Sequence, residues 1–543
     1  MVSLFFYLPE NRTTTFISGG YCLHFGLIEK AKAPPPLIRR DTWIYLTLCL
    51  LALCACSRKK TELAWQQSFY QIGSQSSPRA ADLNADGVLD IVMGAGKQEM
   101  GYVEQAVLAL DGNTGQLLWQ QEADAHLVSS AVFMDINSDG TKDVFIGGRK
   151  HNLMALDGKT GEKLWKYEYR FADDPILKYA RFNFYNSTFV PDQNGDNLPD
   201  LLTVNGGNWD AAPGDSSERY PGVLMLLDAV SGEVLAADTM PDGKESYMSP
   251  LCRESPGSKE VHIIFGTGGE TISGNLYLAS LEDLKAAKLN RAKVIASEET
   301  HGFIAPPVLA DISRDGVPDI IAMSHAGKAW AIDGQTLQPI WEQKFEGLES
   351  SNSFAVGYFN EDDVPDFFTI LSRGTWPEYA AAIQVLLDGR DGQVLYREET
   401  GCFNLSSPVA YDLDRDGYDE ALFSINDYEC GFQLTEESRS PEKVSTQLLM
   451  LDFQEQRTQV IDQAAGFKNI YSTPWLGDLD ADNYLDIVYP QYYNPDDLFQ
   501  FMGMTVKRIS TSITMGEMPR WGEYMGSQGK GLFSPEKKVA QLK

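Results

Sequence analysis

The sequence has few basic residues, few cysteines and no apolar run long enough to cross a bilayer as a helix. Its 543 residues include 45 Lys and Arg against 76 Asp and Glu, a formal net charge of −31 at pH 7. Phosphate binding needs clustered basic side chains, so no nucleic-acid partner is expected. Because 43% of the residues are hydrophobic, the acidity does not indicate disorder. Bound cations are the natural counterpart of such a chain.

The short motifs of common catalytic centres are also missing. The chain has no HExxH and no GxSxG pattern, and its six histidines are scattered. It has neither a CxxCH haem motif nor two adjacent cysteines. A lone histidine such as His151 or His325 is therefore interpreted as a packed or surface residue.

The N-terminal region predicts export. Arg39 and Arg40 precede an apolar run over residues 42–53, and the small residues of 54–57 follow it. This order is typical of a signal peptide, which we place at residues 39–56. Residues 53–56 resemble the bacterial lipobox, which implies acylation of Cys56 and a lipoprotein held by its lipid at the outer membrane or cell surface. An uncleaved membrane anchor is the alternative, disfavoured by the short apolar run.

Two other features of the sequence each allow two interpretations. Residues 1–38 show no strong periodicity and are either an N-terminal extension or the result of a misplaced start. Among the later cysteines, Cys402 and Cys430 form either a disulfide, which export permits, or two buried thiols. Cys252 is then left over.

From residue 76 the chain repeats one pattern. Each copy has a small-residue or proline step, an acidic loop, an apolar strand ending in glycine, a variable loop and a hairpin. The gap between the third and fourth acidic loops is double the usual spacing, and a degenerate unit with Ser249-Pro250 and an apolar strand at 263–266 fills it. The seven acidic loops begin at Asp82, Asp135, Asp192, Asp311, Tyr358, Asp412 and Asp478.

These units predict an all-β fold, a single eight-bladed β-propeller over residues 62–512, with seven blades as the alternative. The segments have strand length, the Asp-Gly-x-Thr-Gly stretches favour hairpins, and units of this size fit propeller blades. Residues 63–67 resemble the blade-ending residues 118–121 but precede the first acidic loop. We therefore expect this N-terminal strand to complete the last blade and close the ring. A C-terminal tail, 513–543, follows without an assigned role.

The repeats resemble two known families. The acidic loops are similar to the calcium-binding FG-GAP or VCBS repeats of integrin-α-type propellers, and the Leu-Asp-Gly-x-Thr-Gly-x-x-Leu-Trp hairpins to those of quinoprotein (PQQ-type) propellers. Both resemblances imply a ring. The recurring tryptophan is interpreted first as core packing, and the missing cysteine pair makes pyrroloquinoline quinone an unexpected cofactor.

The acidic loop has the spacing of a calcium site. Positions 1, 3, 5 and 9 supply carboxylate or amide oxygens, position 7 can supply a carbonyl, and hard oxygens in an irregular shell suit Ca²⁺. Asn or Asp in plain turns is the alternative. Asn197 replaces the usual glycine in the third loop, and the loop at Tyr358 lacks its first carboxylate. The predicted ligands are Asp82, Asn84, Asp86, Asp90, Asp135, Asn137, Asp139, Asp143, Asp192, Asn194, Asp196, Asp200, Asp311, Ser313, Asp315, Asp319, Asn360, Asp362, Asp366, Asp412, Asp414, Asp416, Glu420, Asp478, Asp480, Asp482 and Asp486.

Function is expected in the unequal loops after the glycine-ended strands, which should gather on one face of the ring. A calcium-binding module for a glycan or protein ligand is the first hypothesis. A polysaccharide-active enzyme, similar to the rhamnogalacturonan lyases, is the alternative, and a quinone-dependent dehydrogenase is third. Aromatics that merely pin long loops are the competing structural explanation. The candidate ligand residues are Trp209, Asp210, Tyr220, Arg373, Trp376, Tyr379, Tyr428 and Tyr492.

Overall fold

The computed structural model describes residues 61–534, apart from 213–214, 216, 256–257, 377, 429, 431–443 and 494–499. The predicted extension 1–38, the signal peptide 39–56 and Cys56 lie outside the described residues. Residues 59–543 form one compact unit, to which the described part belongs. No helix among the described residues is long and apolar enough to span a membrane.

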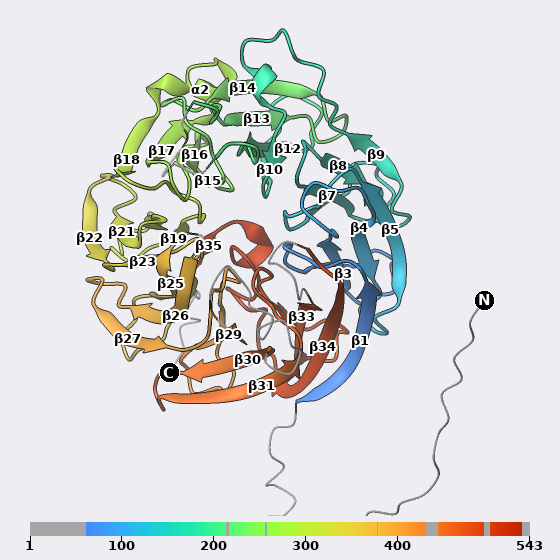
Figure 1. The fold of residues 1–543 in the computed structure, drawn as a ribbon, viewed down its shortest axis with the longest axis vertical. Helices are drawn as coiled ribbons and strands as arrows, with labels where there is room; N and C mark the ends of the chain where they lie inside the picture. The colour runs from blue at the N-terminus through green and yellow to red at the C-terminus, as the bar shows by residue number, and fades with distance from the viewer. Residues whose placement is uncertain are drawn as a thin grey trace, which may run out of the picture. The chain divides into compact units, whose positions relative to one another are not determined.

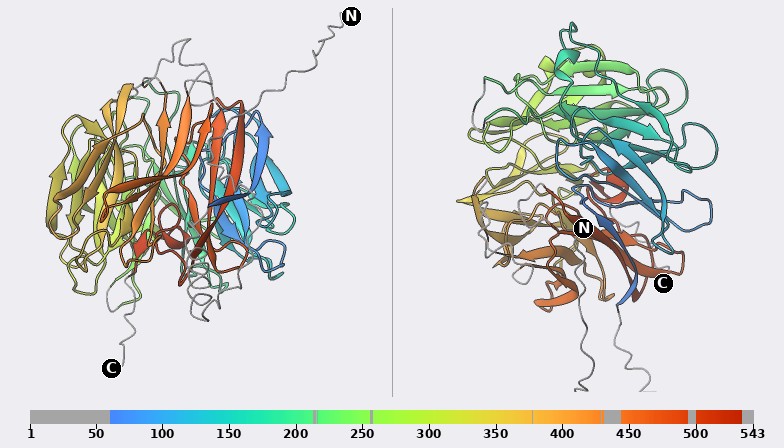
Figure 2. Two further views of the ribbon diagram at one scale, coloured as in Figure 1. Left: turned by 90° about the horizontal axis from the view of Figure 1, so that it is seen from below. Right: turned by 45° about the vertical axis from the view of Figure 1, so that its right-hand side comes forward.

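Eight antiparallel sheets stand around a central axis like the blades of a propeller (Figure 1). The turned views in Figure 2 show a thick ring whose strands run from one face to the other. The predicted all-β fold and its eight blades are confirmed, and the seven-bladed alternative is wrong. The short helical segments are η1 (Leu177–Tyr179), α2 (Leu281–Lys285), η2 (Leu289–Arg291) and η4 (Ser527–Gly529).

Each blade has a short inner strand and longer outer strands, in chain order from the axis outward. Blade 1 has β2 (Arg79–Ala81), β3 (Asp90–Gly94), β4 (Val103–Leu110) and β5 (Leu117–Ala123); blade 2 has β6 (Val132–Met134), β7 (Asp143–Gly147), β8 (Leu153–Leu156) and β9 (Lys163–Lys166). Blade 3 has β10 (Asn183–Phe184), β11 (Thr188–Val190), β12 (Asp200–Gly206), β13 (Val223–Leu227) and β14 (Val234–Thr239); blade 4 has β15 (Leu251–Glu254), β16 (Val261–Gly266), β17 (Gly274–Ser280) and β18 (Lys293–Glu298).

The second half of the ring repeats this plan. Blade 5 has β19 (Val308–Ala310), β20 (Asp319–Met323), β21 (Lys328–Ile332) and β22 (Pro339–Lys344); blade 6 has β23 (Leu348–Glu349), β24 (Ala355–Gly357), β25 (Asp366–Thr375), β26 (Glu378–Leu387) and β27 (Val394–Glu399). Blade 7 has β28 (Val409–Tyr411), β29 (Glu420–Asp427), β30 (Ser445–Asp452) and β31 (Arg457–Ala465); blade 8 has β32 (Trp475–Gly477), β33 (Tyr484–Tyr493), β34 (Gly503–Thr514) and, as its outer strand, β1 (Glu62–Tyr70).

The N-terminal strand closes the ring. β1 pairs antiparallel with β34, from Glu62 opposite Ser510 to Tyr70 opposite Gly503. Near the axis, the amide of Thr473 donates to Ser77 Oγ at 3.0 Å, which joins blade 8 to blade 1. The expected closure by residues 63–67 is therefore confirmed.

The hairpin tryptophans join neighbouring blades through hydrogen bonds and ring packing. Trp65 Nε1 donates to the carbonyl of Gly112 in blade 1, and Trp119 Nε1 donates to Gly158 in blade 2, each at 2.8 Å. The Trp65 ring lies against Gly115, where a Cβ atom would come within 2.5 Å of it. Interblade packing thus accounts for these tryptophans, as predicted.

Blade 4 is the degenerate unit, and its predicted strand 263–266 lies within β16. A turn replaces the acidic loop between β15 and β16. In this blade Arg253 makes the link to the next blade, donating to the carbonyls of Pro318 at 3.0 Å and Gly334 at 2.7 Å. Arg253 therefore takes the role that tryptophan has elsewhere.

The described part of the C-terminal tail, up to residue 534, lies in the central channel. β34 ends at Thr514, two residues beyond the predicted boundary, and the chain then turns inward (Figure 1). Ala410 of blade 7 donates its amide to the carbonyl of Trp521 at 2.9 Å, and β35 (Leu532–Phe533) pairs parallel with β19 of blade 5. The tail thus ties several inner strands to one another.

Candidate functional site

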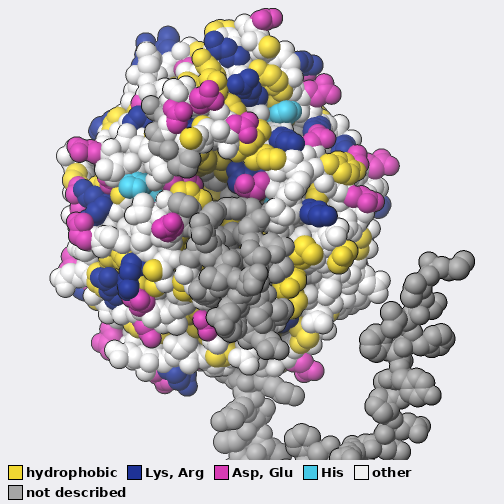
Figure 3. Space-filling view, in the orientation of Figure 1, with side chains coloured by type: hydrophobic (Ala, Val, Ile, Leu, Met, Phe, Trp, Pro, Cys, Tyr) yellow, Lys and Arg dark blue, Asp and Glu magenta, His cyan; other side chains and the backbone are white. Residues whose placement is uncertain are grey.

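The two faces of the ring differ in character. In each blade that has an acidic loop, this loop between the inner strand and the next strand, and in blades 1 to 7 the hairpin between the last two strands, project from one face, because successive strands are antiparallel. We call this the acidic face. The loops after the glycine-ended strands and the connections between blades project from the other, which we call the loop face. On the face seen in Figure 3, acidic and basic side chains are interspersed.

A pocket of about 340 Å³ lies on the loop face, with walls from blades on all sides of the axis. It is within the range of ligand sites in proteins, roughly 300–1,000 Å³. Its lining residues are Gln75, Glu99, Arg149, Asn183, Gly207, Asn208, Trp209, Ala211, Arg219, Tyr247, Glu270, Ser351, Trp376, Tyr379, Phe403, Leu405 and Tyr471. We call it the central pocket.

Three of the predicted ligand residues line this pocket. Trp209 comes from the blade 3 loop and is 37% exposed, while in blade 6 Trp376 follows β25 and Tyr379 lies at the start of β26. Tyr379 stacks on Phe403 with ring centroids 4.8 Å apart, which holds this part of the wall. The structure therefore brings together aromatic residues from two distant blades.

The other predicted ligand residues are not part of the wall. Arg373 forms an ion pair with Glu399 on the outer strand. Tyr220 stacks on Phe182, with centroids 5.7 Å apart. Asp210 follows Trp209 but does not line the pocket.

Two tyrosines predicted as ligand residues are buried behind the wall. Tyr492 is fully buried and accepts a hydrogen bond from the Ile470 amide at 2.9 Å, while Tyr428 lies under the ammonium group of Lys468. Tyr492 also stacks on Tyr471, which does line the pocket. For both tyrosines, a role in fixing the loops fits the structure better than contact with a ligand.

Charged residues missing from the sequence prediction line the same pocket. Arg149 donates to Glu99 at 2.6 Å, and Arg219 Nη1 donates to both oxygens of Glu245 at 3.0 and 3.1 Å. The Nε atoms of Arg149 and Arg219 are buried and find no acceptor among the described residues. Glu99, Arg149 and Glu270 each follow a glycine-ended strand, as Trp209 does. That shared position was the signal that could have identified them.

The Arg219 cluster is rigid. The Tyr247 hydroxyl accepts a further hydrogen bond from Arg219 at 2.8 Å. Burial raises the pKa of Glu245 above its usual range although the nearby Arg219 opposes the shift. Burial raises the pKa of Tyr247 as well.

A second pocket, of about 390 Å³, adjoins this cluster between blades 3 and 4. Arg219 belongs to the walls of both pockets. The lining residues of this second pocket are Arg219, Gly243, Lys244, Glu245, Thr271, Ile272, Ser273, Glu299 and Thr300. We call it the side pocket.

Two histidines converge on one buried carboxylate beside the central pocket. Glu349 lies 3.1 Å from His325 Nε2 and 3.4 Å from His301 Nε2, and it accepts hydrogen bonds from the Tyr379 hydroxyl at 2.7 Å and the Trp376 amide at 2.8 Å. Burial alone would raise the pKa of Glu349, but its hydrogen bonds hold that pKa well below the usual range. His325 is buried, as expected, but it is not isolated. The cluster anchors the wall segment that carries Trp376.

His126 lies under the wall formed by blades 1 and 2. It is fully buried, packs edge-on against Phe501, and leaves no room for a side chain at Gly96. The Arg149 amide donates to its carbonyl at 2.9 Å. Burial, with a smaller effect from the Arg149 charge, lowers the pKa of His126 to about 3.

This lowered pKa predicts a sensitivity to acid. The unfolded chain binds a proton at His126 near pH 6.5 and the folded chain only near pH 3, so stability falls as the pH drops through that window. We expect His126→Gln to remove a slope of about 1.4 kcal/mol per pH unit from the stability profile. Urea unfolding at several pH values measures this slope. An unchanged slope in His126→Gln would contradict the assignment.

In the acidic loops, side-chain carboxylates accept hydrogen bonds from backbone amides of the same loop. In the first loop, Asp82 accepts hydrogen bonds from the amides of Ala85 at 2.8 Å and Gly87 at 3.1 Å. The final carboxylate, Asp90, is fully buried and accepts from Gly112 at 3.0 Å, which ties the loop to the hairpin of the same blade. The predicted ligands of this loop therefore lie in a compact turn.

The donor set of these loops fits a hard cation. Carboxylate oxygens of Asp412, Asp414 and Glu420 lie within 4.8 Å of one another. Burial, followed by smaller effects that include the neighbouring carboxylates, raises the pKa of Glu420 to about 9. Asp200 Oδ1 in the third loop is buried without a hydrogen-bond partner among the described residues. A bound cation would offset the repulsion between these carboxylates and the cost of burying their charge.

Two loops differ because an arginine reaches their carboxylates. In blade 8 the buried Arg508 contacts Asp480 at 2.5 Å and Asp486 at 2.9 Å. Oxygens of Asp478, Asp480 and Asp486 also converge within 4.8 Å, but two of these three residues already face this guanidinium group. In blade 6, Arg390 contacts Asp362 at 2.9 Å. An arginine side chain thus pairs with carboxylates of the loops that begin at Asp478 and Tyr358.

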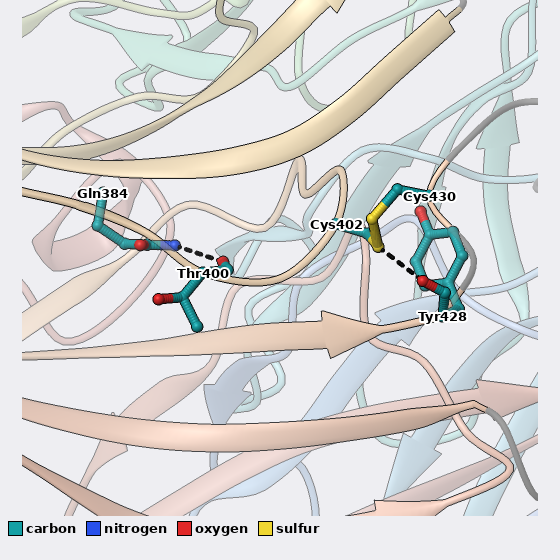
Figure 4. The surroundings of a disulfide bond; sticks show 5 residues. All are labelled: Gln384, Thr400, Cys402, Tyr428 and Cys430. Atoms are coloured by element: carbon teal, nitrogen blue, oxygen red, sulfur yellow. Dashed lines mark hydrogen bonds between the residues drawn. A yellow bond between two sulfur atoms is a disulfide. The ribbon is translucent and has the colours of Figure 1, made fainter.

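Cys402 and Cys430 form a disulfide, with Cα atoms 5.3 Å apart (Figure 4). Cys402 Sγ also contacts the carbonyl oxygen of Tyr428 at 3.0 Å. The bond joins the connection between blades 6 and 7 to the segment after β29. The disulfide alternative is therefore the one found in the structure, and Cys252 is the free cysteine among the described residues.

Fold and site together define an all-β, eight-bladed propeller with a ligand-sized pocket on its axis. Residues 50–239 match the family model described as outer membrane protein assembly factor BamB, so the first three blades carry repeats of the quinoprotein-like type. The chain is 23% identical to Protein FAM234B of Gallus gallus over 418 residues, which are 69% of this chain and 62% of that protein. The match thus spans less than two thirds of that relative's length.

One of two aligned solved structures supports the fold. A europium-containing methanol dehydrogenase aligns with 83% of this chain and 93% of its own, with 12% identity and a TM-score of 0.52. Rhamnogalacturonan lyase YesW aligns with 86% of this chain and 76% of its own, with 11% identity and a TM-score of 0.49. At such low identity the likeness shows the fold alone.

Proposed function

We propose that the protein is an exported, lipid-anchored binding module that holds a saccharide in the central pocket. One observation carries the proposal: two tryptophans from blades 3 and 6 share a pocket with Arg149, its partner Glu99, and Arg219. The apolar face of a sugar ring packs on an aromatic side chain, while paired arginines and carboxylates suit its hydroxyl groups. Acylation at Cys56 would hold the propeller at a membrane surface.

The carboxylates of the pocket favour binding over catalysis. Sugar cleavage needs an acid and a base with suitable pKa values on opposite sides of the bond. Glu99, which lines the pocket together with Glu270, is engaged by Arg149, and Glu349, which lies beside the pocket, is engaged by its histidines. Burial raises the pKa of Tyr379, which makes it a poor base at neutral pH. Product release in a glycan-cleavage assay would favour the polysaccharide-active alternative.

The binding proposal predicts that the tryptophans are essential. We expect the double variant Trp209→Ala, Trp376→Ala to weaken binding on a glycan array by roughly tenfold to a hundredfold. Each substitution removes the stacking and the buried area that the tryptophan ring supplies. Tyr70→Ala, which removes an aromatic side chain that is 76% exposed on β1, is the matched control. Binding retained by the double variant, with an unchanged melting temperature, would refute this site.

We also propose that Ca²⁺ occupies the acidic loops of blades 1, 2, 3, 5 and 7. These loops begin at Asp82, Asp135, Asp192, Asp311 and Asp412. The ion would be held by the side-chain oxygens of positions 1, 3, 5 and 9, and it would fasten each loop to its blade. Its role is structural, because these loops lie on the acidic face and the central pocket on the loop face.

A further inference from the structure

We propose that the central pocket and the side pocket form one site for a linear oligosaccharide. The chain would run from the axis across Arg219 to the boundary of blades 3 and 4. The inference rests on the proposed saccharide function and adds the length and path of the ligand. Pocket size, shared walls and the chemistry of the second cavity support it.

Arg219 and its partners form a thin wall between the two pockets. Arg219 faces both cavities, Tyr247 lines the central pocket, and Glu245 lines the side pocket. Glu245 is almost fully buried and fixes the guanidinium group through two hydrogen bonds. A ligand crossing this point therefore meets a fixed planar group, whose Nε finds no acceptor among the described residues.

The side pocket has a different chemistry from the central one. Its lining includes hydroxyl and charged side chains but no aromatic ring. Lys244 Nζ donates to Ser273 Oγ at 2.8 Å, so the two side chains already form a hydrogen-bonded pair. Such a wall suits sugar hydroxyls without stacking, as expected for units that extend a chain anchored elsewhere by tryptophan.

The volumes also favour a chain. The pockets measure about 340 and 390 Å³, so each alone lies near the lower end of the range for small-molecule sites, roughly 300–1,000 Å³. Together they offer space for several sugar units. The two linings combine the cations Arg149, Arg219 and Lys244 with the carboxylates Glu99, Glu245, Glu270 and Glu299. Recognition is therefore through hydroxyl groups and chain length more than through ligand charge.

The test is a length series measured by isothermal titration calorimetry on the full exported domain. The probes are linear oligosaccharides of two to six units, made of β-1,4-linked glucose, xylose or mannose, with α-1,4-linked galacturonic acid as the charged series. We expect at least a tenfold gain in affinity between the disaccharide and the longer members of the series that binds. Ser273→Trp, which fills the side pocket, should abolish this gain.

Two further variants make the result specific. Lys244→Ala should reduce the gain without adding bulk, and Ser258→Trp, at an exposed serine in the β15–β16 turn, should leave it unchanged. Equal affinity for all lengths would overturn the extended site but leave saccharide binding intact. A gain that survives both side-pocket variants would overturn the path. A failure of every probe to bind would instead overturn the proposed saccharide function.

Discussion

Removal of calcium with EDTA is expected to lower the melting temperature of the propeller by about 10 °C or more. An ion that binds the folded state at a hundred times its Kd contributes roughly 2.7 kcal/mol per site, and several loops would lose this contribution together. The buried carboxylates would then face one another without a counterion. Differential scanning calorimetry with and without EDTA measures the effect, and elemental analysis counts the ions.

The blade 8 loop, whose carboxylates are contacted by Arg508 of β34, provides the internal control for this experiment. Asp412→Asn should remove one ion and reduce the EDTA effect, because Asp412 belongs to one of the five loops proposed to hold Ca²⁺. Asp478→Asn should change the ion count little, because Arg508 already neutralises Asp480 and Asp486. An unchanged melt together with no bound calcium would show that these loops are ordinary turns.

Local signals in the sequence were sufficient to predict the ring. Acidic loops, glycine-ended strands and hairpins are each formed by residues close in the chain, so their order counted the blades. The unit with Ser249-Pro250 was recognised without an acidic loop because its strand 263–266 kept the spacing. Even the closing strand was visible, since residues 63–67 copy the end of a blade that starts elsewhere.

The contents of the central pocket could not be predicted in the same way. Periodicity says that loops occupy equivalent places, but not which side chains face the axis. Glu349 gathers His301 and His325 from other segments, and nothing near any of them in the sequence marks that meeting. Tyr428 and Tyr492 show the converse: the sequence places these aromatic residues in variable loops, where contact with a ligand is expected, and the structure buries both side chains.

The arginine contacts with the acidic loops could not be predicted for a related reason. Arg508 lies on a strand 22 residues after Asp486, outside the nine-residue pattern that predicts calcium. A guanidinium group at that position satisfies two carboxylates and leaves less need for an ion. The role of the tail was equally hidden, because its contacts are with inner strands distributed over the whole chain.

Loss of the tail's ion pair is expected to destabilise the protein strongly. Arg79 on β2 is only 4% exposed, and Glu523 of the tail lies 2.8 Å from it. Glu523→Ala leaves this guanidinium group buried without its counterion, which costs roughly 3–5 kcal/mol for a pair of this kind. Urea unfolding of the purified domain measures the loss.

An exposed ion pair gives the matched comparison. Arg170 and Glu233 are 59% and 64% exposed, so Glu233→Ala should change stability by less than about 1 kcal/mol. Because the cost in Glu523→Ala comes from the unpaired arginine, the double variant Arg79→Met, Glu523→Leu should be more stable than Glu523→Ala alone. Equal losses in the buried and the exposed variants would mean that the tail lies in the channel without fastening it. The expected difference would show that blade 1 is held from the axis as well as by its neighbours in the ring.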